Sequence, residues 1–201
     1  MKKWILPFII VGISISCPVF GQSVFKQFVA VLDKAGMNFI KPVGMKETPL
    51  IRNDELDYQY AIKDSANNLE IRYLVYPLQD MVRKYNANQP DSGMPNIDPN
   101  FMHTNLLIVY SLKLQGKDFT NIGSFPEVKE LPHATCEKEF NADWGGEINL
   151  QPCDEFAQKY KYCTLLEIHK DNIADAFIIF LYNRNDAPED LLAPVLTTLK
   201  F

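Results

Sequence analysis

Residues 56–76 read LDYQYAIKDSANNLEIRYLVY, and the pattern of this stretch decides the fold class. In residues 56–63 apolar and polar side chains alternate, which is typical of a strand with one buried face. Residues 64–68 are rich in turn-forming side chains, and residues 69–76 alternate again. The stretch therefore predicts a β-hairpin of two antiparallel strands. Four residues of the first strand are predicted to share its buried face: Leu56, Tyr58, Tyr60 and Ile62.

Further strands and helices flank this hairpin. Residues 176–182, AFIIFLY, are continuously apolar, as expected of a central strand that is covered on both faces. Residues 101–115 predict a strongly apolar helix, with Asp98 and Pro99 at its start and Gly116 at its end. The order of the elements predicts an α+β fold, an antiparallel sheet with helices packed on its faces. The other predicted strands span residues 147–152 and 162–170, and the other predicted helices span residues 25–35, 79–85, 134–141 and 188–199.

The N-terminus has the three parts of a secretory signal peptide. Lysines follow Met1, residues 4–15 are almost wholly apolar, and residues 18–21 end in a small residue. We therefore predict cleavage after Gly21, which leaves one globular domain of residues 22–201 in the periplasm or outside the cell. An uncleaved membrane anchor is one alternative, although the apolar run is shorter than the ~18 residues that span a bilayer. Lipoprotein processing at Cys17 is the other.

Composition and motifs argue against several classes of function. The chain of 201 residues carries 20 Lys and Arg against 25 Asp and Glu, a net charge of −5, so binding to nucleic acid through phosphate attraction is not expected. No nucleophile-elbow, phosphate-loop or dinucleotide motif occurs. Ser23 and Lys26 fit an S-x-x-K pattern, but helix capping explains Ser23 better. The sequence thus predicts no catalytic residue, no cofactor, no metal site and no membrane-spanning segment in the mature chain.

The three cysteines beyond the predicted cleavage site are odd in number, so at least one stays unpaired or bonds another molecule. If the strand before Cys153 and the strand that holds Cys163 are antiparallel neighbours, both thiols face one side of the sheet, which predicts a disulfide bond between them. The alternative is three reduced, buried thiols. His133 and Cys136, together with Cys163 and His169, are the residue types of a zinc site, but the usual ligand spacing is absent.

An acidic segment that contains a tryptophan is the most distinctive part of the chain. Residues 127–155 hold eight acidic side chains against two lysines, and they include the run NADWGG at 141–146. The paired glycines let the backbone turn sharply and leave one face of the Trp144 ring open. Asp143, Trp144 and Glu147 are therefore the candidate ligand patch, suited to a basic peptide, a cation or a sugar. The alternative is that Trp144 fills the core beside a tight turn and that the acids are merely solvated.

Several segments together resemble the PsbP-like family. Residues 37–47, MNFIKPVGMKE, are similar to the family's entry segment, in which a short strand leads into a turn and then into an amphipathic strand. The strands at 162–170 and 176–182 and the closing run at 196–201 also resemble that fold, as does the hairpin. The resemblance, which extends to the Mog-type members, implies an α/β/α sandwich that mainly binds other proteins, and it carries over no catalytic residue. Residues 141–146 are also similar to uncharacterised exported proteins of Bacteroidetes.

The functional expectation follows from the export signal, the single predicted core and the missing motifs. We expect an exported, non-catalytic module that binds a protein or a small ligand. The alternative is a hydrolase or thiol-dependent enzyme of the cell envelope that uses Cys136, His133 or the acidic segment. A purely structural envelope component is a third interpretation.

Overall fold

The computed structural model describes residues 20–52, 56–88, 95–117, 120, 123–184 and 188–201. The predicted signal peptide lies outside these residues, Cys17 included, except that Phe20 and Gly21 begin helix α1 (Phe20–Ala35). Cleavage after Gly21 and processing at Cys17 therefore stay predictions. Within the described part of the chain, no helix is both long and apolar enough to cross a bilayer.

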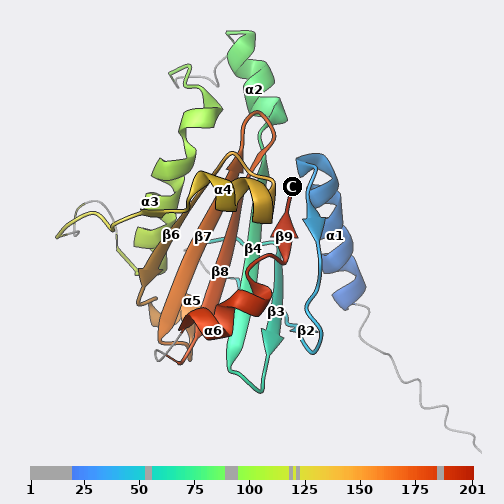
Figure 1. Cartoon of the computed structure of the whole chain (residues 1–201), viewed down its shortest axis with the longest axis vertical. Helices are drawn as coiled ribbons and strands as arrows, with labels where there is room; N and C mark the ends of the chain where they lie inside the picture. The colour runs from blue at the N-terminus through green and yellow to red at the C-terminus, as the bar shows by residue number, and fades with distance from the viewer. Residues whose placement is uncertain (1–19, 53–55, 89–94, 118–119, 121–122, 185–187) are drawn as a thin grey trace, which may run out of the picture.

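Seven antiparallel strands form the main sheet, in the order β2-β3-β4-β8-β7-β6-β5 (Figure 1). The predicted hairpin is β3–β4, and β7–β8 forms a second hairpin beside it. A separate ladder joins β1 to β9 near the C-terminus. The strands are β1 Asn38–Phe39, β2 Lys46–Glu47, β3 Tyr60–Asp64, β4 Leu69–Pro77, β5 Lys129–Glu130, β6 Trp144–Leu150, β7 Tyr162–Lys170, β8 Ala174–Tyr182 and β9 Leu199–Lys200.

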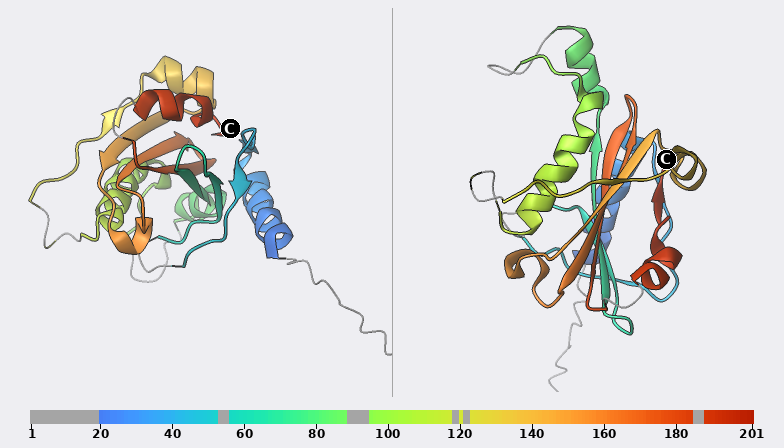
Figure 2. Two further views of the ribbon diagram at one scale, coloured as in Figure 1. Left: turned by 90° about the horizontal axis from the view of Figure 1, so that it is seen from below. Right: turned by 60° about the vertical axis from the view of Figure 1, so that its left-hand side comes forward.

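Helices cover both faces of this sheet, which confirms the predicted α+β class. One face packs against α1, η2, α6 and β9, and the other packs against α3 and α5 (Figure 2). The C-terminal helix is shorter than predicted because Pro194 cannot donate a helical hydrogen bond, and Leu199 pairs with β1 instead. The remaining helical segments are α2 Gln79–Asn86, η1 Pro99–Phe101, α3 His103–Leu114, α4 His133–Thr135, η2 Cys136–Phe140, α5 Asp154–Ala157, α6 Pro188–Leu192 and η3 Ala193–Val195.

Strand β8 lies at the centre of the sheet and is buried along its whole length. Its predicted role as a strand covered on both faces is confirmed, since β4 and β7 flank it and helices lie above and below. Strand β7 spans the predicted residues, but it too is buried on both faces, so the polar side chains of Glu167 and His169 are enclosed. This enclosure creates the polar cluster described below.

The start and end of the α3 region follow the sequence signals. The side chain of Asp98 accepts a hydrogen bond from the N–H of Asn100 at 3.0 Å, and Pro99 occupies the first position of η1. Gly116 follows α3 with φ of +64°, the left-handed conformation that glycine adopts most readily. These contacts explain why the apolar helix has the predicted position.

The predicted alternation of the first hairpin strand is wrong before Gln59, because Leu56 and Tyr58 face the opposite side of the sheet from Tyr60 and Ile62. The N–H of Gln59 donates to the carbonyl of Tyr73 at 2.8 Å, and Tyr60 pairs with the same residue, so two residues oppose one, as in a β-bulge. Consequently Tyr58 joins the core beneath α3, whereas Tyr60 joins the core beneath α1. The side-chain amide of Gln59 then pairs with both backbone groups of Val75, at 2.8 and 3.0 Å, in place of a strand.

A buried ion pair fixes α5 against the sheet. The side chain of Arg72, 1% exposed, donates to Glu70 at 2.7 Å and to the carbonyl of Phe156 at 2.7 Å. Its guanidinium also lies over the rings of Tyr58 and Phe156, at 4.7 and 4.4 Å from their centroids. A charge this deeply enclosed is tolerated because its donors are satisfied.

Candidate functional site

The outer edge of β6 is the most distinctive surface of the sheet. β6 has seven residues, but β5 pairs only with Gly146 and Glu147. Among the described residues, no strand continues this ladder along Ile148 and Leu150. Because β5 is so short, the last part of β6 is an open sheet edge.

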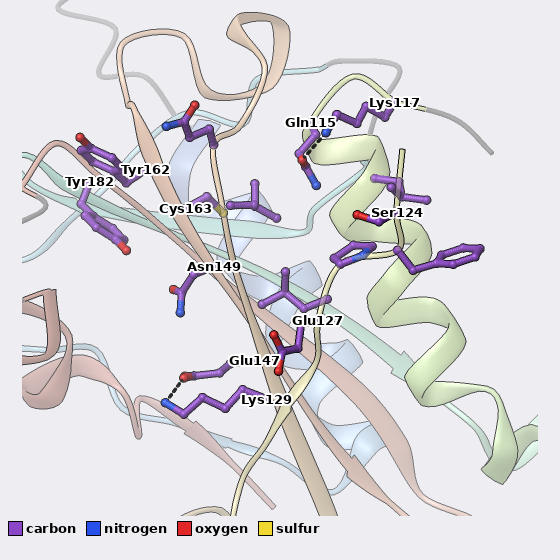
Figure 3. Close-up of a pocket in the computed structure, with 16 residues that line it drawn as sticks. Gln115, Lys117, Ser124, Glu127, Lys129, Glu147, Asn149, Tyr162, Cys163 and Tyr182 are labelled. Carbon is purple, nitrogen blue, oxygen red and sulfur yellow. Dashed lines mark hydrogen bonds and ion pairs between the residues drawn. The ribbon is translucent and has the colours of Figure 1, made fainter. Parts of the chain in front are cut away.

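A groove of about 1190 Å³ lies along this open edge (Figure 3). The loop of residues 124–127 forms one wall and the end of α3 another. In Figure 3, Tyr162, Tyr182 and Asn149 lie to one side of the strand, and Gln115 and Ser124 lie to the other. The groove therefore spans both faces of the sheet at its edge.

The ladder already formed shows which backbone groups face the groove. The N–H of Leu131 donates to the carbonyl of Gly145 at 2.9 Å, and Glu147 pairs with Lys129. In an antiparallel sheet alternate residues direct their backbone groups to the same neighbour. The N–H and carbonyl of Asn149 are therefore next in that series, and they point outward along the open edge.

Polar and aromatic side chains line the face of the groove beneath α6. The hydroxyl of Thr164 donates to the side-chain oxygen of Asn149 at 2.6 Å and lies 3.0 Å from the hydroxyl of Tyr182. The rings of Tyr162 and Tyr182 stack with centroids 6.0 Å apart. Burial raises the pKa of Tyr182, so its hydroxyl stays neutral. This wall presents a neutral aromatic surface with hydrogen-bonding groups.

Apolar side chains line the opposite face, beneath α3. Ile148 and Leu150 belong to the core on this side, and Leu112 and Cys163 lie beside them. Burial raises the pKa of the Cys163 thiol well beyond its usual value, so this thiol stays protonated. Here the groove offers apolar contact rather than a nucleophile.

The charged groups of the groove balance. Lys129 donates to Glu147 at 2.7 Å, and this hydrogen bond raises the pKa of the lysine. Lys117 donates to the side-chain oxygen of Gln115 at 2.9 Å, and Glu127 is exposed at the rim. Two lysines and two glutamates therefore line the groove, so it favours neither a positively nor a negatively charged ligand.

The predicted ligand patch is only partly brought together. Trp144 packs against the core beneath α3, and its ring lies so close over Gly146 that a Cβ there would be 2.6 Å from the ring. The ring also contacts His103, with centroids 4.5 Å apart. Glu147, three residues along the strand, has the opposite side-chain direction and lines the groove. Asp143 does not line the groove. Its carboxylate accepts a hydrogen bond from the backbone N–H of Asp171 at 2.9 Å.

The predicted disulfide is not formed in the structure, where Cys163 is a buried thiol. The strand argument does not reach Cys153, because β6 ends at Leu150 and Cys153 precedes α5. There its backbone N–H donates to the carbonyl of Leu114 at 2.7 Å. Both cysteines nevertheless contact the same core, so the bond between them stays a prediction.

The residues proposed for a thiol enzyme do not form a reactive pair. Cys136 is 1% exposed, and burial raises the pKa of its thiol, opposite to the shift that a nucleophilic thiolate needs. His133 is exposed one turn earlier. Across the described ranges, no group of three or more His, Cys, Asp or Glu side chains has an arrangement that could hold a metal ion.

A buried polar cluster beneath α3 was not predicted. His169 lies between two carboxylates, with Asp175 at 2.5 Å from Nδ1 and Asp171 at 3.0 Å from Nε2, and its ring stacks on His103 with centroids 4.3 Å apart. Burial lowers the pKa of His169, but the two carboxylates outweigh burial and raise it overall. Burial and the neighbouring His169 lower the pKa of His103. His169 is thus the member of this histidine pair that is protonated more readily.

Glu167 belongs to the same cluster and lies near Asp175. It is fully buried, and neither of its carboxyl oxygens has a hydrogen-bond partner. Burial, reinforced by the charge of Asp175, raises its pKa well above the ordinary value. The sequence signal was the alternation of β7, which places Glu167 and His169 on one face, combined with Asp175 in an otherwise apolar strand. The groove along β6 is not lined by Glu167, His169 or Asp175.

Comparison with known proteins yields no match to this chain, whether with family models, curated proteins or solved structures. The PsbP-like resemblance therefore stays a prediction. What the chain binds has to be argued from its own surface.

Proposed function

We propose that this protein is a binding module for an extended segment of another polypeptide, which adds a strand to the outer edge of β6. The observation that carries the proposal is the ladder that stops at Glu147 while β6 continues to Leu150 beside a groove of about 1190 Å³. An extended peptide can pair with such an edge through its backbone, while pockets on either side select its side chains.

The two walls of the groove define the preferred peptide. Successive side chains of an added strand point to opposite faces. One set meets Tyr162 and Tyr182, and the next set meets Leu112, Leu150 and the other apolar side chains beneath α3. We expect aromatic or polar residues to alternate with apolar ones. Because the charges in the groove balance, a peptide without strong net charge fits best.

A backbone-methylation scan tests this binding mode. A peptide of ~12 residues, enriched from a random displayed library on the purified protein, is resynthesised with single N-methyl groups, and its affinity is measured by fluorescence anisotropy. Methyl groups at alternate residues remove N–H groups that pair with β6, so they weaken binding at least about tenfold, whereas methyl groups between them have little effect. A scan without this two-residue period contradicts the proposal.

Two matched variants locate the site on the protein. Tyr162→Ser removes an aromatic ring from the groove and should weaken the same peptide about tenfold, whereas Tyr85→Ser removes a comparable ring from α2, away from the groove, and should not. Amide chemical shifts should move at Ile148–Gln151 on peptide addition. Equal effects of the two substitutions, or shifts confined to another region, would place the peptide elsewhere.

A further inference from the structure

A second large cavity, of about 1120 Å³, is lined by residues of β2 and β3. These strands lie at the edge of the sheet opposite to β5 and β6 (Figure 1). Its position follows from the bulge at Gln59, which interrupts the edge just before β3 begins. Tyr58 and Tyr60 line it from opposite faces of the sheet, so the cavity curves around the strand. Its volume suits a drug-sized small molecule.

The wall opposite the sheet is held in place by a defined contact. The backbone N–H of Ile51 donates to the hydroxyl of Tyr58 at 2.7 Å, which positions residues 48–52 over the cavity. Leu50 and Leu74 add apolar surface, and Tyr76 adds a third aromatic ring. The cavity is thus a built site with a mainly apolar lining.

Tyr60 supplies an unusual polar group in this setting. The side chain is 1% exposed, its ring stacks on Phe28 at 4.9 Å, and its hydroxyl has no hydrogen bond of normal geometry. Burial raises the pKa of Tyr60, and the neighbouring carboxylate of Glu47 raises it further. The carboxylate of Glu47 thus places negative charge beside this end of the cavity, which favours a positively charged ligand group there.

The charged side chains that line the cavity also favour a positively charged ligand. Glu47 and Asp57 outnumber Arg52 among its ionisable acids and bases. Glu47 has an exposed neighbour, Lys41, at 3.9 Å, but the two side chains are 38% and 46% exposed, and such a pair contributes little to stability. Glu47 can therefore accept a hydrogen bond from a further cation. Tyrosine rings attract cations through their negative faces as well.

We propose that this cavity binds a small organic amine with a bulky apolar body. The ammonium group donates a hydrogen bond to the carboxylate of Glu47, and the faces of the tyrosine rings attract its charge. The apolar body packs against Leu50, Leu74 and the ring of Tyr58. The site is separate from the groove at β6, and it does not depend on the function proposed there.

Three probes that share an indole ring test the charge preference. Tryptamine carries a positive charge, tryptophol carries none, and indole-3-acetate carries a negative charge. By titration calorimetry, tryptamine should bind at least about tenfold more tightly than tryptophol, and indole-3-acetate should bind more weakly than both. Equal or tighter binding of tryptophol or indole-3-acetate overturns the proposal, as does the absence of detectable tryptamine binding at millimolar concentration.

A variant tests the ammonium partner. Glu47→Gln keeps the shape of the side chain and should fold, as checked by circular dichroism. It should weaken tryptamine about tenfold and tryptophol by less than twofold. Glu130→Gln, on the exposed strand β5, is the matched control and should leave tryptamine binding unchanged. Unchanged tryptamine affinity in Glu47→Gln, or an equal loss in Glu130→Gln, would overturn the proposal.

Discussion

Replacing Glu167 by Gln should change how the stability of this protein depends on pH. The carboxyl group of Glu167 is fully enclosed beneath α3, has no hydrogen-bond partner and lies near the charge of Asp175. In the unfolded chain the same group ionises near its ordinary pKa of 4.5. Because the folded pKa is raised, this group stabilises the fold most below the unfolded pKa, and the stability falls as the pH rises towards the folded pKa.

The size of the effect follows from proton linkage. Over each pH unit in which Glu167 stays protonated in the folded protein and ionises in the unfolded chain, the free energy of unfolding falls by about 1.4 kcal/mol. Each two pH units between the unfolded and the folded pKa therefore cost about 3 kcal/mol, a large part of the 5–15 kcal/mol that is typical of a domain. Gln cannot ionise, so the variant lacks this loss.

The assay compares urea unfolding of the two proteins at half-unit steps from pH 5 to pH 8. The relevant quantity is the unfolding free energy of Glu167→Gln minus that of wild type, which should rise with pH at about 1.4 kcal/mol per unit until the pH reaches the folded pKa of Glu167. A constant offset between the proteins is expected too, since the buried amide of Gln also lacks partners. Glu130→Gln, on the exposed strand β5, is the control and should follow the wild-type profile.

Parallel profiles for Glu167→Gln and wild type would refute the reasoning. They would mean that Glu167 ionises in the folded protein near its ordinary pKa. A difference that shrinks as the pH rises would refute it too, because it would mean that the folded state favours the charged carboxylate.

The remaining predictions concern the buried ion pair and the cysteines. Arg72→Met leaves the charge of Glu70 enclosed and should lower the free energy of unfolding by about 3–5 kcal/mol, whereas the double variant with Glu70→Leu should recover most of that loss in the same urea titration. A double variant no more stable than Arg72→Met would show that the lost stacking contacts, and not the stranded charge, set the cost. If Cys153 and Cys163 form the predicted disulfide in secreted protein, neither will react with iodoacetamide after unfolding without reductant, as read by mass spectrometry. If they stay reduced, both will react on unfolding, and Cys163 will be protected in the folded state because it is buried.

Local sequence patterns were sufficient to predict several strands and the fold class. The apolar run of β8 and the alternation of β4 and β7 depend on side chains two residues apart, so the sequence alone was sufficient to predict these strands and the α+β class. The same is true of Asp98 and Gly116 at the ends of the α3 region, since these signals are local.

The bulge at Gln59 depended on the tertiary structure. The side-chain amide of Gln59 bonds to Val75, sixteen residues away, beside the bulge that places Tyr58 and Tyr60 on opposite faces of the sheet. The alternation within residues 56–63 holds no information about a hydrogen-bond partner at Val75. The cavity beside β3 could not be predicted for the same reason.

The candidate site divides in the same way. The sequence by itself predicted a strand from Glu147 onward and a sharp turn at the two glycines before it, because these signals come from neighbouring residues. The predicted turn is wrong, since β6 begins at Trp144 and continues through both glycines. Only the tertiary structure decided that Trp144 is packed under α3 while Glu147 borders a groove, since that depends on which element covers each face. The tertiary structure also decided where the pairing of β5 with β6 ends, and hence which backbone groups of β6 face the groove. The two strands come from separate chain segments that meet only in the folded protein.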